Sequence, residues 1–195
     1  MDQLRAKNAP LIKVSAEELS FQGRPLAAPP VVRDVFDMLG QPDRILPGTP
    51  PGPPGHRNNE AYMYDDLGMY WLRQHDSERI LSLSVVFAQS NGPISVPFMP
   101  SSPFCGAILL PGLTVTSRTR DVELRNALRN PATQAIANIA GAYIGPFHIS
   151  FLTAVNSQAA ATTGNLASVS IGLRHWSKPT APPGGMASEP PPSMA

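Results

Sequence analysis

The sequence predicts an α+β protein in which two similar strand–helix–hairpin modules form antiparallel sheet, with helices packed on one face. The segment 79–87 alternates apolar and small polar side chains, which is the period of a half-buried strand. The segment 31–39 repeats its apolar side chains at helical spacing, and Gly40 follows it as a stop signal. The sequence at 82–85 (SLSV) is echoed at 168–171 (SVSI), which indicates a duplicated unit.

The first predicted module covers residues 17–90. Its expected elements are a strand at 18–21, a helix at 31–39, a hairpin at 61–74 and a strand at 79–87. A proline-rich loop at 47–55 interrupts the module, because proline is excluded from helix interiors and from central strands. Within the hairpin, residues 65–68 (DDLG) have the composition of a turn.

The second predicted module covers residues 104–176 and repeats this order. Its expected elements are a strand at 107–110, a helix at 121–128 and strands at 146–156 and 165–173. A linker at 91–103, which contains four prolines, separates the two modules. An N-terminal segment at 1–16 precedes them. The tail at 177–195 is rich in proline and lacks apolar periodicity, so we expect it to be disordered.

The charge composition argues against a nucleic-acid partner. Charged residues make up 15% of the chain, and 15 basic residues balance 14 acidic ones to a net charge of +1. Nucleic-acid binding needs clustered lysine and arginine, so we expect no nucleic-acid partner. The single cysteine, Cys105, excludes an internal disulfide and a cysteine-based zinc site. Its apolar neighbours predict that it is a buried small side chain.

A long uncharged stretch at 130–173 must be considered as a candidate membrane-spanning segment. Its most apolar part, 135–155, is long enough to span a bilayer. Gly145-Pro146 falls in its middle, however, and the residues that follow alternate with strand period. The N-terminus also leads into no apolar signal segment. We therefore expect a soluble, cytoplasmic protein. A membrane or assembly protein that uses 130–173 as its contact remains the alternative.

The sequence contains no motif for catalysis, cofactor binding or metal binding. The four histidines lack the i, i+4 spacing of a helical zinc motif, and no serine elbow or phosphate-binding loop is present. The pair His75-Asp76 lies in a polar segment typical of a solvated hairpin tip. His148 lies in an apolar strand and reads as a core or half-exposed side chain. We therefore expect that the protein is not an enzyme. An enzyme with an unrecognised active site is the third functional alternative.

Partner binding is the function that the aromatic residues favour. Six candidate partner-binding residues fall within ten positions: Tyr62, Tyr64, Asp65, Asp66, Tyr70 and Trp71. Tyrosine and tryptophan dominate binding hot spots, and adjacent carboxylates would suit a basic partner surface. Two structural alternatives stay open for this segment. The aromatic residues could pack beneath the neighbouring helix, and the two aspartates could serve only the turn.

Three segments carry a resemblance to a known family: 39–44 (LGQPDR), 64–70 (YDDLGMY) and the strand around 83–85 (LSV). Together they resemble two-module immunity proteins found beside toxic effectors in bacterial type VI and related secretion loci. The second half, from Phe104 to Ile171, is similar to that family's second module, and the resemblance extends over residues 17–173. It implies a tandem-repeat fold similar to β-lactamase-inhibitor proteins. It also implies a cytoplasmic inhibitor that occludes one cognate toxin, with no catalytic residue and no cofactor.

Overall fold

A computed structural model describes most of the chain. The described residues are 9–47, 59–75, 77–88, 99–129, 135–138, 141–156, 161–173 and 176. The proline-rich loop predicted at 47–55 lies outside them except for Pro47, and so does the tail predicted at 177–195. Most of the linker predicted at 91–103 is also outside the described residues.

The described residues form thirteen strands, two α-helices and one short 3-10 helix, η1. The strands of the first half are β1 Leu11–Val14, β2 Leu19–Phe21, β3 Arg24–Pro25, β4 Arg44–Pro47, β5 Asn59–Tyr64, β6 Met69–Gln74 and β7 Ile80–Val86. Those of the second half are β8 Ala107–Leu110, β9 Leu113–Val115, β10 Ala135–Asn138, β11 Gly141–Ile144, β12 Phe147–Asn156 and β13 Ala161–Gly172. The helices are α1 Val32–Leu39, η1 Asp65–Leu67 and α2 Asp121–Arg129.

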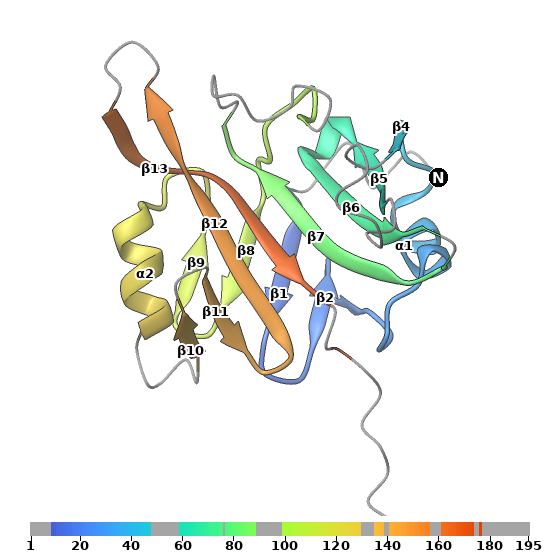
Figure 1. The fold of residues 1–195 in the computed structure, drawn as a ribbon, viewed down its shortest axis with the longest axis horizontal. Coiled ribbons are helices and arrows are strands. Elements are labelled where there is room, and N and C mark those ends of the chain that lie inside the picture. The colour runs from blue at the N-terminus through green and yellow to red at the C-terminus, as the bar shows by residue number, and fades with distance from the viewer. Residues whose placement is uncertain are drawn as a thin grey trace, which may run out of the picture.

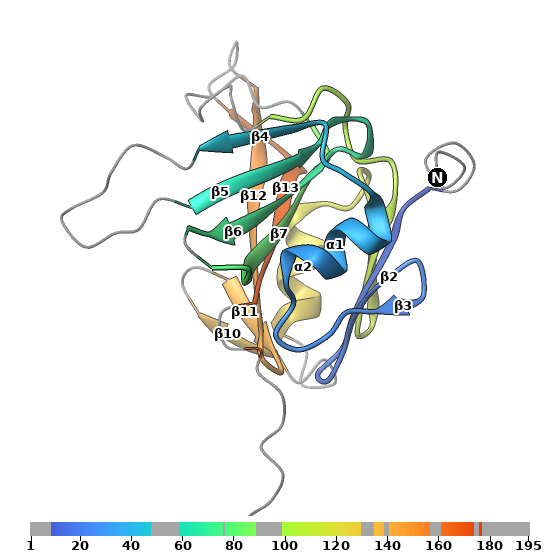
Figure 2. The same ribbon diagram turned by 90° about the vertical axis from the view of Figure 1, so that its right-hand side faces the viewer.

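Two sheets form the layers of the fold, with one α-helix at each side (Figures 1 and 2). The larger sheet has eight strands in the order β10-β11-β12-β13-β7-β6-β5-β4, and the smaller has five in the order β3-β2-β1-β8-β9. Every neighbouring pair in the larger sheet is antiparallel, whereas β1 and β8 pair in parallel in the smaller one. The parallel pair joins the two halves of the chain within the smaller sheet.

The predicted α+β class is therefore wrong, because the protein is mainly β. The second layer against the eight-stranded sheet is another sheet, and the α-helices contain only eight and nine residues. Two groups of strands account for the error. The segment 11–14, for which the sequence predicts no strand, forms β1 between β2 and β8. The alanine-rich segment 135–144 contributes β10 and β11 to the larger sheet.

The order of elements repeats along the chain. A short hairpin, a helix and four antiparallel strands appear as β2 to β7 and again as β8 to β13. The last strands of the two repeats, β7 and β13, pair at the centre of the larger sheet, where Ser84 lies opposite Ser170. Ser84 and Ser170 are each the third residue of the echoed sequences at 82–85 and 168–171. Because equivalent residues of antiparallel strands face each other, an approximate two-fold axis passes between them.

Details before each helix repeat in the same way. An isolated bridge joins Val31 to Arg79 in the first repeat and Arg120 to Asn165 in the second. The Val31 amide donates to the Asp34 carboxylate at 3.1 Å, and the Arg120 amide donates to Glu123 at 2.7 Å. Residues 89 positions apart thus occupy equivalent places in the hairpin and helix of the two repeats. This spacing provides an internal comparison between the two halves.

One hydrophobic core fills the space between the sheets. The smaller sheet contributes Ile12, Leu19 and Ile108, and the larger sheet contributes Trp71, Leu83 and Ile171, all nearly inaccessible to solvent. The described part of the uncharged stretch 130–173 forms β10 to β13, and alternate residues of β11 to β13 point into this core. Among the described helices, none is long and apolar enough to cross a membrane.

Candidate functional site

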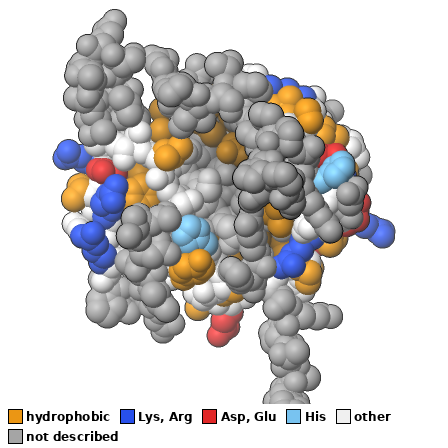
Figure 3. Space-filling model, viewed as in Figure 1, with side chains coloured by type: hydrophobic (Ala, Val, Ile, Leu, Met, Phe, Trp, Pro, Cys, Tyr) orange, Lys and Arg blue, Asp and Glu red, His pale blue; other side chains and the backbone are white. Residues whose placement is uncertain are grey.

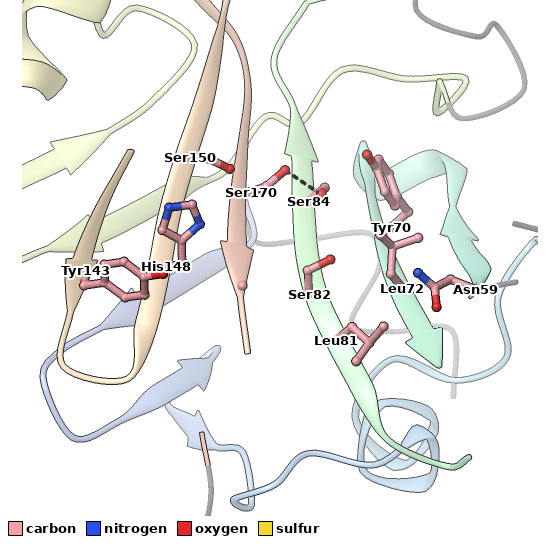
Figure 4. A pocket seen from close by; sticks show the side chains of 11 residues that line it. Asn59, Tyr70, Leu72, Leu81, Ser82, Ser84, Tyr143, His148, Ser150 and Ser170 are labelled. Atoms are coloured by element: carbon pink, nitrogen blue, oxygen red, sulfur yellow. Dashed lines mark hydrogen bonds between the residues drawn. The ribbon is translucent and has the colours of Figure 1, made fainter. Parts of the chain in front are cut away.

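A groove of about 450 Å³ lies on the face of the eight-stranded sheet that points away from the core (Figure 4). Its lining comes from both repeats: Asn59, Tyr70, Leu72, Leu81, Ser82, Ser84, Tyr143, His148, Ser150, Ser170 and Gly172. The groove crosses the seam between β7 and β13. The described residues that line it include no aspartate, glutamate, lysine or arginine.

Small polar side chains form the floor of this groove. Leu83 and Val85 of β7 point into the core, so the alternation of the strand directs Ser84 to the opposite face. The Ser84 and Ser170 hydroxyls lie 2.7 Å apart and form a hydrogen bond across the seam. Gly172, on β13, adds no side chain. Because these side chains are small, the centre of this sheet face is recessed and forms the bottom of the groove.

Aromatic side chains stand on either side of the floor. Tyr70 and Leu72 of β6 line one side, and Tyr143 of β11 and His148 of β12 line the other (Figure 4). The Tyr143 and His148 rings are in contact, with centroids 4.8 Å apart and planes inclined by 46°. A neutral floor between aromatic sides suits contact with an uncharged ligand surface.

Three of the six candidate partner-binding residues lie in the core. Tyr62 is 4% exposed, and Tyr64 and Trp71 are completely buried. The Phe36 ring of α1 packs edge-on against Tyr62, with centroids 5.6 Å apart. The Tyr64 hydroxyl donates to the Gly40 carbonyl at 2.9 Å. Packing beneath the helix, one of the two structural alternatives, therefore describes these three aromatic residues.

Tyr70 and Asp66 differ from the buried three. Strand alternation places Tyr70 on the open face, where it is half-buried in the wall of the groove. Asp66 is exposed in η1. These two side chains retain surface that a partner could contact, and only Tyr70 lines the groove.

Asp65 makes several contacts with its surroundings. Its carboxylate accepts hydrogen bonds from Arg44 at 2.7 and 2.9 Å and from the Ser101 amide at 3.0 Å. Its own amide donates to the Asp43 carboxylate at 2.7 Å. The hydrogen bonds from Arg44 lower the pKa of Asp65, which partial burial opposes. Arg44 also donates to the Met99 carbonyl at 2.7 Å, so these contacts join β4 and η1 to the chain that enters the second repeat.

The glycine of the DDLG segment completes the same junction. Gly68 has a φ of +67°, and a β-carbon there would collide with the backbone of Phe104. A left-handed conformation and close backbone contact both favour glycine at this position. The segments 39–44 and 64–68, which carry the resemblance, therefore meet in one structural junction. We call the contacts of Asp43, Arg44, Asp65 and Gly68 the Asp65 junction.

The groove residues other than Tyr70 were not among the sequence-derived candidates. The echo between 82–85 and 168–171 was the signal that could have identified the floor, because Ser84 and Ser170 occupy its centre. Tyr143 and His148 had no such signal. They meet only because β11 pairs with β12.

In the described part of the chain, two contacts connect side chains that line the groove: the Ser84–Ser170 hydrogen bond and the Tyr143–His148 ring contact. No hydrogen bond joins His148 to Ser150 or Ser170 among the described residues. Within the same part of the chain, no group of three or more His, Cys, Asp or Glu side chains could hold a metal ion. Elsewhere, His75 is exposed and lies 3.7 Å from Glu60. Cys105 is also exposed, contrary to the prediction, whereas the side chain of its neighbour Phe104 is buried in the core.

Comparisons with known proteins connect the chain to one family. No curated protein and no solved structure matches it. A family described as "Domain of unknown function (DUF7738)" matches residues 11–125, which is more than half of the chain. The matched region runs from β1 into α2 and includes the whole Asp65 junction. The chain belongs to the DUF7738 family.

Proposed function

We propose that this protein is a cytoplasmic inhibitor that binds a cognate protein toxin and neutralises it by occlusion, without chemistry of its own. Two kinds of evidence support the proposal. The segments 39–44 and 64–70 resemble those of two-module immunity proteins. Independently, the larger sheet has one face covered by the smaller sheet and an open groove on the other.

The observation that carries the proposal is the uncharged groove between aromatic sides. Tyr70 and Tyr143 offer large contact area and lose few rotamers on binding, which is why tyrosine is common in binding surfaces. Ser84 is buried, but the partly exposed hydroxyls of Ser82, Ser150 and Ser170 can donate to and accept from a polypeptide backbone. The described lining contains no aspartate, glutamate, lysine or arginine that would be left buried and unpaired beneath a partner. We assign the groove to an uncharged, extended segment of the toxin.

The Asp65 junction supports binding because it fixes the wall of the groove. Gly68 immediately precedes β6, and the Val86 amide of β7 donates to its carbonyl at 2.9 Å. Tyr70 lies two residues farther along β6, between β5 and β7. Its backbone is therefore held before any partner arrives, which reduces the entropic cost of association.

His148 is the groove residue that a catalytic hypothesis would use. Its ring contacts Tyr143, and it forms no hydrogen bond with a described serine. A general base must come within hydrogen-bonding reach of the proton that it removes. We therefore assign His148 to the contact surface, next to Tyr143, where an imidazole adds a polar edge to an aromatic side.

The test uses the protein encoded beside this one as the candidate toxin. The two proteins are co-expressed, and their dissociation constant and the protection of growth are measured. Replacement of Ser150 by Trp fills the groove and should abolish both binding and protection. Ile45→Trp adds the same side chain at a 53%-exposed position outside the groove and should leave both intact. Equal protection by the two folded variants would overturn the groove assignment.

A further inference from the structure

Four exposed arginines surround α2 in the second repeat: Arg118, Arg120, Arg125 and Arg129. We call them the α2 arginine face. Lysine and arginine side chains gather at the left edge of Figure 3, where Figure 1 shows α2. The described residues of the second repeat contain no other lysine or arginine and only two carboxylates, Asp121 and Glu123. This part of the molecule therefore carries an excess of positive charge.

The two carboxylates leave most of this charge unpaired. Asp121 lies 3.6 Å from Arg125, and Glu123 accepts a hydrogen bond from the backbone amide of Arg120. Among the described residues, the guanidinium groups of Arg118, Arg120 and Arg129 have no ion-pair partner. In the first repeat, by contrast, three of the five described arginines, Arg33, Arg44 and Arg73, pair with carboxylates.

The internal repeat shows that the fold does not require these arginines. The equivalent positions, 89 residues earlier, hold Pro29, Val31, Phe36 and Gly40. The first repeat thus builds the same hairpin and helix, with the same bridge and the same carboxylate-to-amide contact, without any charge at these four positions. The arginines are a property of the second repeat alone, and their role must be sought outside the architecture that the repeats share.

Two of the arginines are positioned by the surface beneath them. The Arg125 guanidinium lies over the Phe151 ring of β12, 4.9 Å from its centre, in a cation–π contact. Arg120 lies beside Gly164 of β13, where a β-carbon would come within 3.3 Å of Nη2. Val122, which lies between them in the sequence, is 46% exposed and adds apolar surface. This combination of arginine and exposed aliphatic surface is typical of protein interfaces.

We propose that the α2 arginine face binds an acidic surface on a protein partner. The proposal rests on the proposed function only where that partner is the toxin. Guanidinium groups bind carboxylates through paired hydrogen bonds, and four of them in twelve residues would orient an acidic surface. A nucleic acid fits less well because the chain has a net charge of only +1, and a phosphate backbone makes no use of Val122. The groove would then anchor the partner, and the arginine face would steer its approach.

The first experiment probes the arginine face without the toxin. Binding of poly-L-glutamate is measured at low salt for the wild type and for Arg118→Ser/Arg129→Ser, which leaves both positioned arginines in place. The double variant should lose about tenfold in affinity. The control, Arg24→Ser/Arg33→Ser, removes two cations from the first repeat and should bind like the wild type. Equal losses in both variants, or no binding by the wild type, would overturn the proposal.

Two further measurements separate the remaining outcomes. Duplex DNA serves as a second polyanion, and tighter binding of DNA than of poly-L-glutamate would overturn the assignment to an acidic protein. Binding of the neighbouring-gene protein is measured with the same variants. If the wild type binds poly-L-glutamate through the arginines but does not bind that protein, the proposed function fails while this inference stands. If the wild type binds that protein, and Arg118→Ser/Arg129→Ser binds both that protein and poly-L-glutamate as tightly as Arg24→Ser/Arg33→Ser does, only this inference fails.

Discussion

The hydroxyls of Ser84 and Ser170 form a hydrogen bond of 2.7 Å across the approximate two-fold axis of the larger sheet. The two serines are equivalent residues of the two repeats, so each half of the chain supplies half of the floor of the groove. The candidate binding surface therefore exists only where both repeats are folded together.

This contact predicts a measurable coupling between the two serines. Ser84→Ala or Ser170→Ala should each lower the free energy of unfolding by about 1 kcal/mol, because the remaining hydroxyl loses its partner. The double variant should lose less than the sum of the two. Urea unfolding of all four proteins gives the coupling energy. Ser82→Ala is the control, because Ser82 faces the same groove opposite Gly172 with no described hydrogen bond. Additive losses would contradict the contact.

The second prediction compares two glycines with similar backbone conformations. Gly68 has a φ of +67° and Gly23 a φ of +74°, but only at Gly68 would a β-carbon collide with Phe104. Gly23→Ala should lower the free energy of unfolding by about 1 kcal/mol, the cost of the left-handed conformation alone. Gly68→Ala should cost at least about 2 kcal/mol more, because the backbone of Phe104 must move. Equal losses in thermal or urea unfolding would contradict the close packing of the junction.

The third prediction concerns the pH dependence of stability. Arg44 lowers the pKa of Asp65 below its ordinary value of 3.8, so the folded state favours the ionised carboxylate. The stabilisation is present above pH 3.8 and is lost as pH falls through the lower pKa of the folded state. At pH 7, Asp65→Asn should lower the free energy of unfolding by about 2 kcal/mol. The difference between wild type and variant should shrink below pH 3.8. A difference that stays constant from pH 7 to pH 2.5 would contradict this account.

The local elements were largely predictable from the sequence. The helix expected at 31–39 is α1 at Val32–Leu39, and the one expected at 121–128 is α2 at Asp121–Arg129. The strand expected at 107–110 is β8. In each case the apolar period and its stop signals lie within the segment itself. The fold class was not predictable in this way, because β1 contains four residues and is defined by its parallel pairing with the distant β8.

The candidate site was predictable only in part, because both faces of β5 and β6 carry apolar or aromatic residues. The alternation separates Tyr70 from Trp71, but it does not say which of the two faces the core. The smaller sheet and α1 decide this by covering the Trp71 side. The other side of the groove depends on Tyr143 and His148, whose contact arises from strand pairing that no local pattern announces.

The fourth prediction and the most direct test of the binding account is the affinity of Tyr70→Ala for the protein encoded beside this one. Tyr70 is half-buried in the groove wall, whereas Tyr64 is fully buried and donates to Gly40. Loss of an aromatic anchor should raise the dissociation constant about 30-fold, or about 2 kcal/mol. The melting temperature should stay close to the wild-type value, while that of Tyr64→Ala should fall by several degrees. Wild-type affinity in a folded Tyr70→Ala protein would contradict the assignment of the groove as the binding surface.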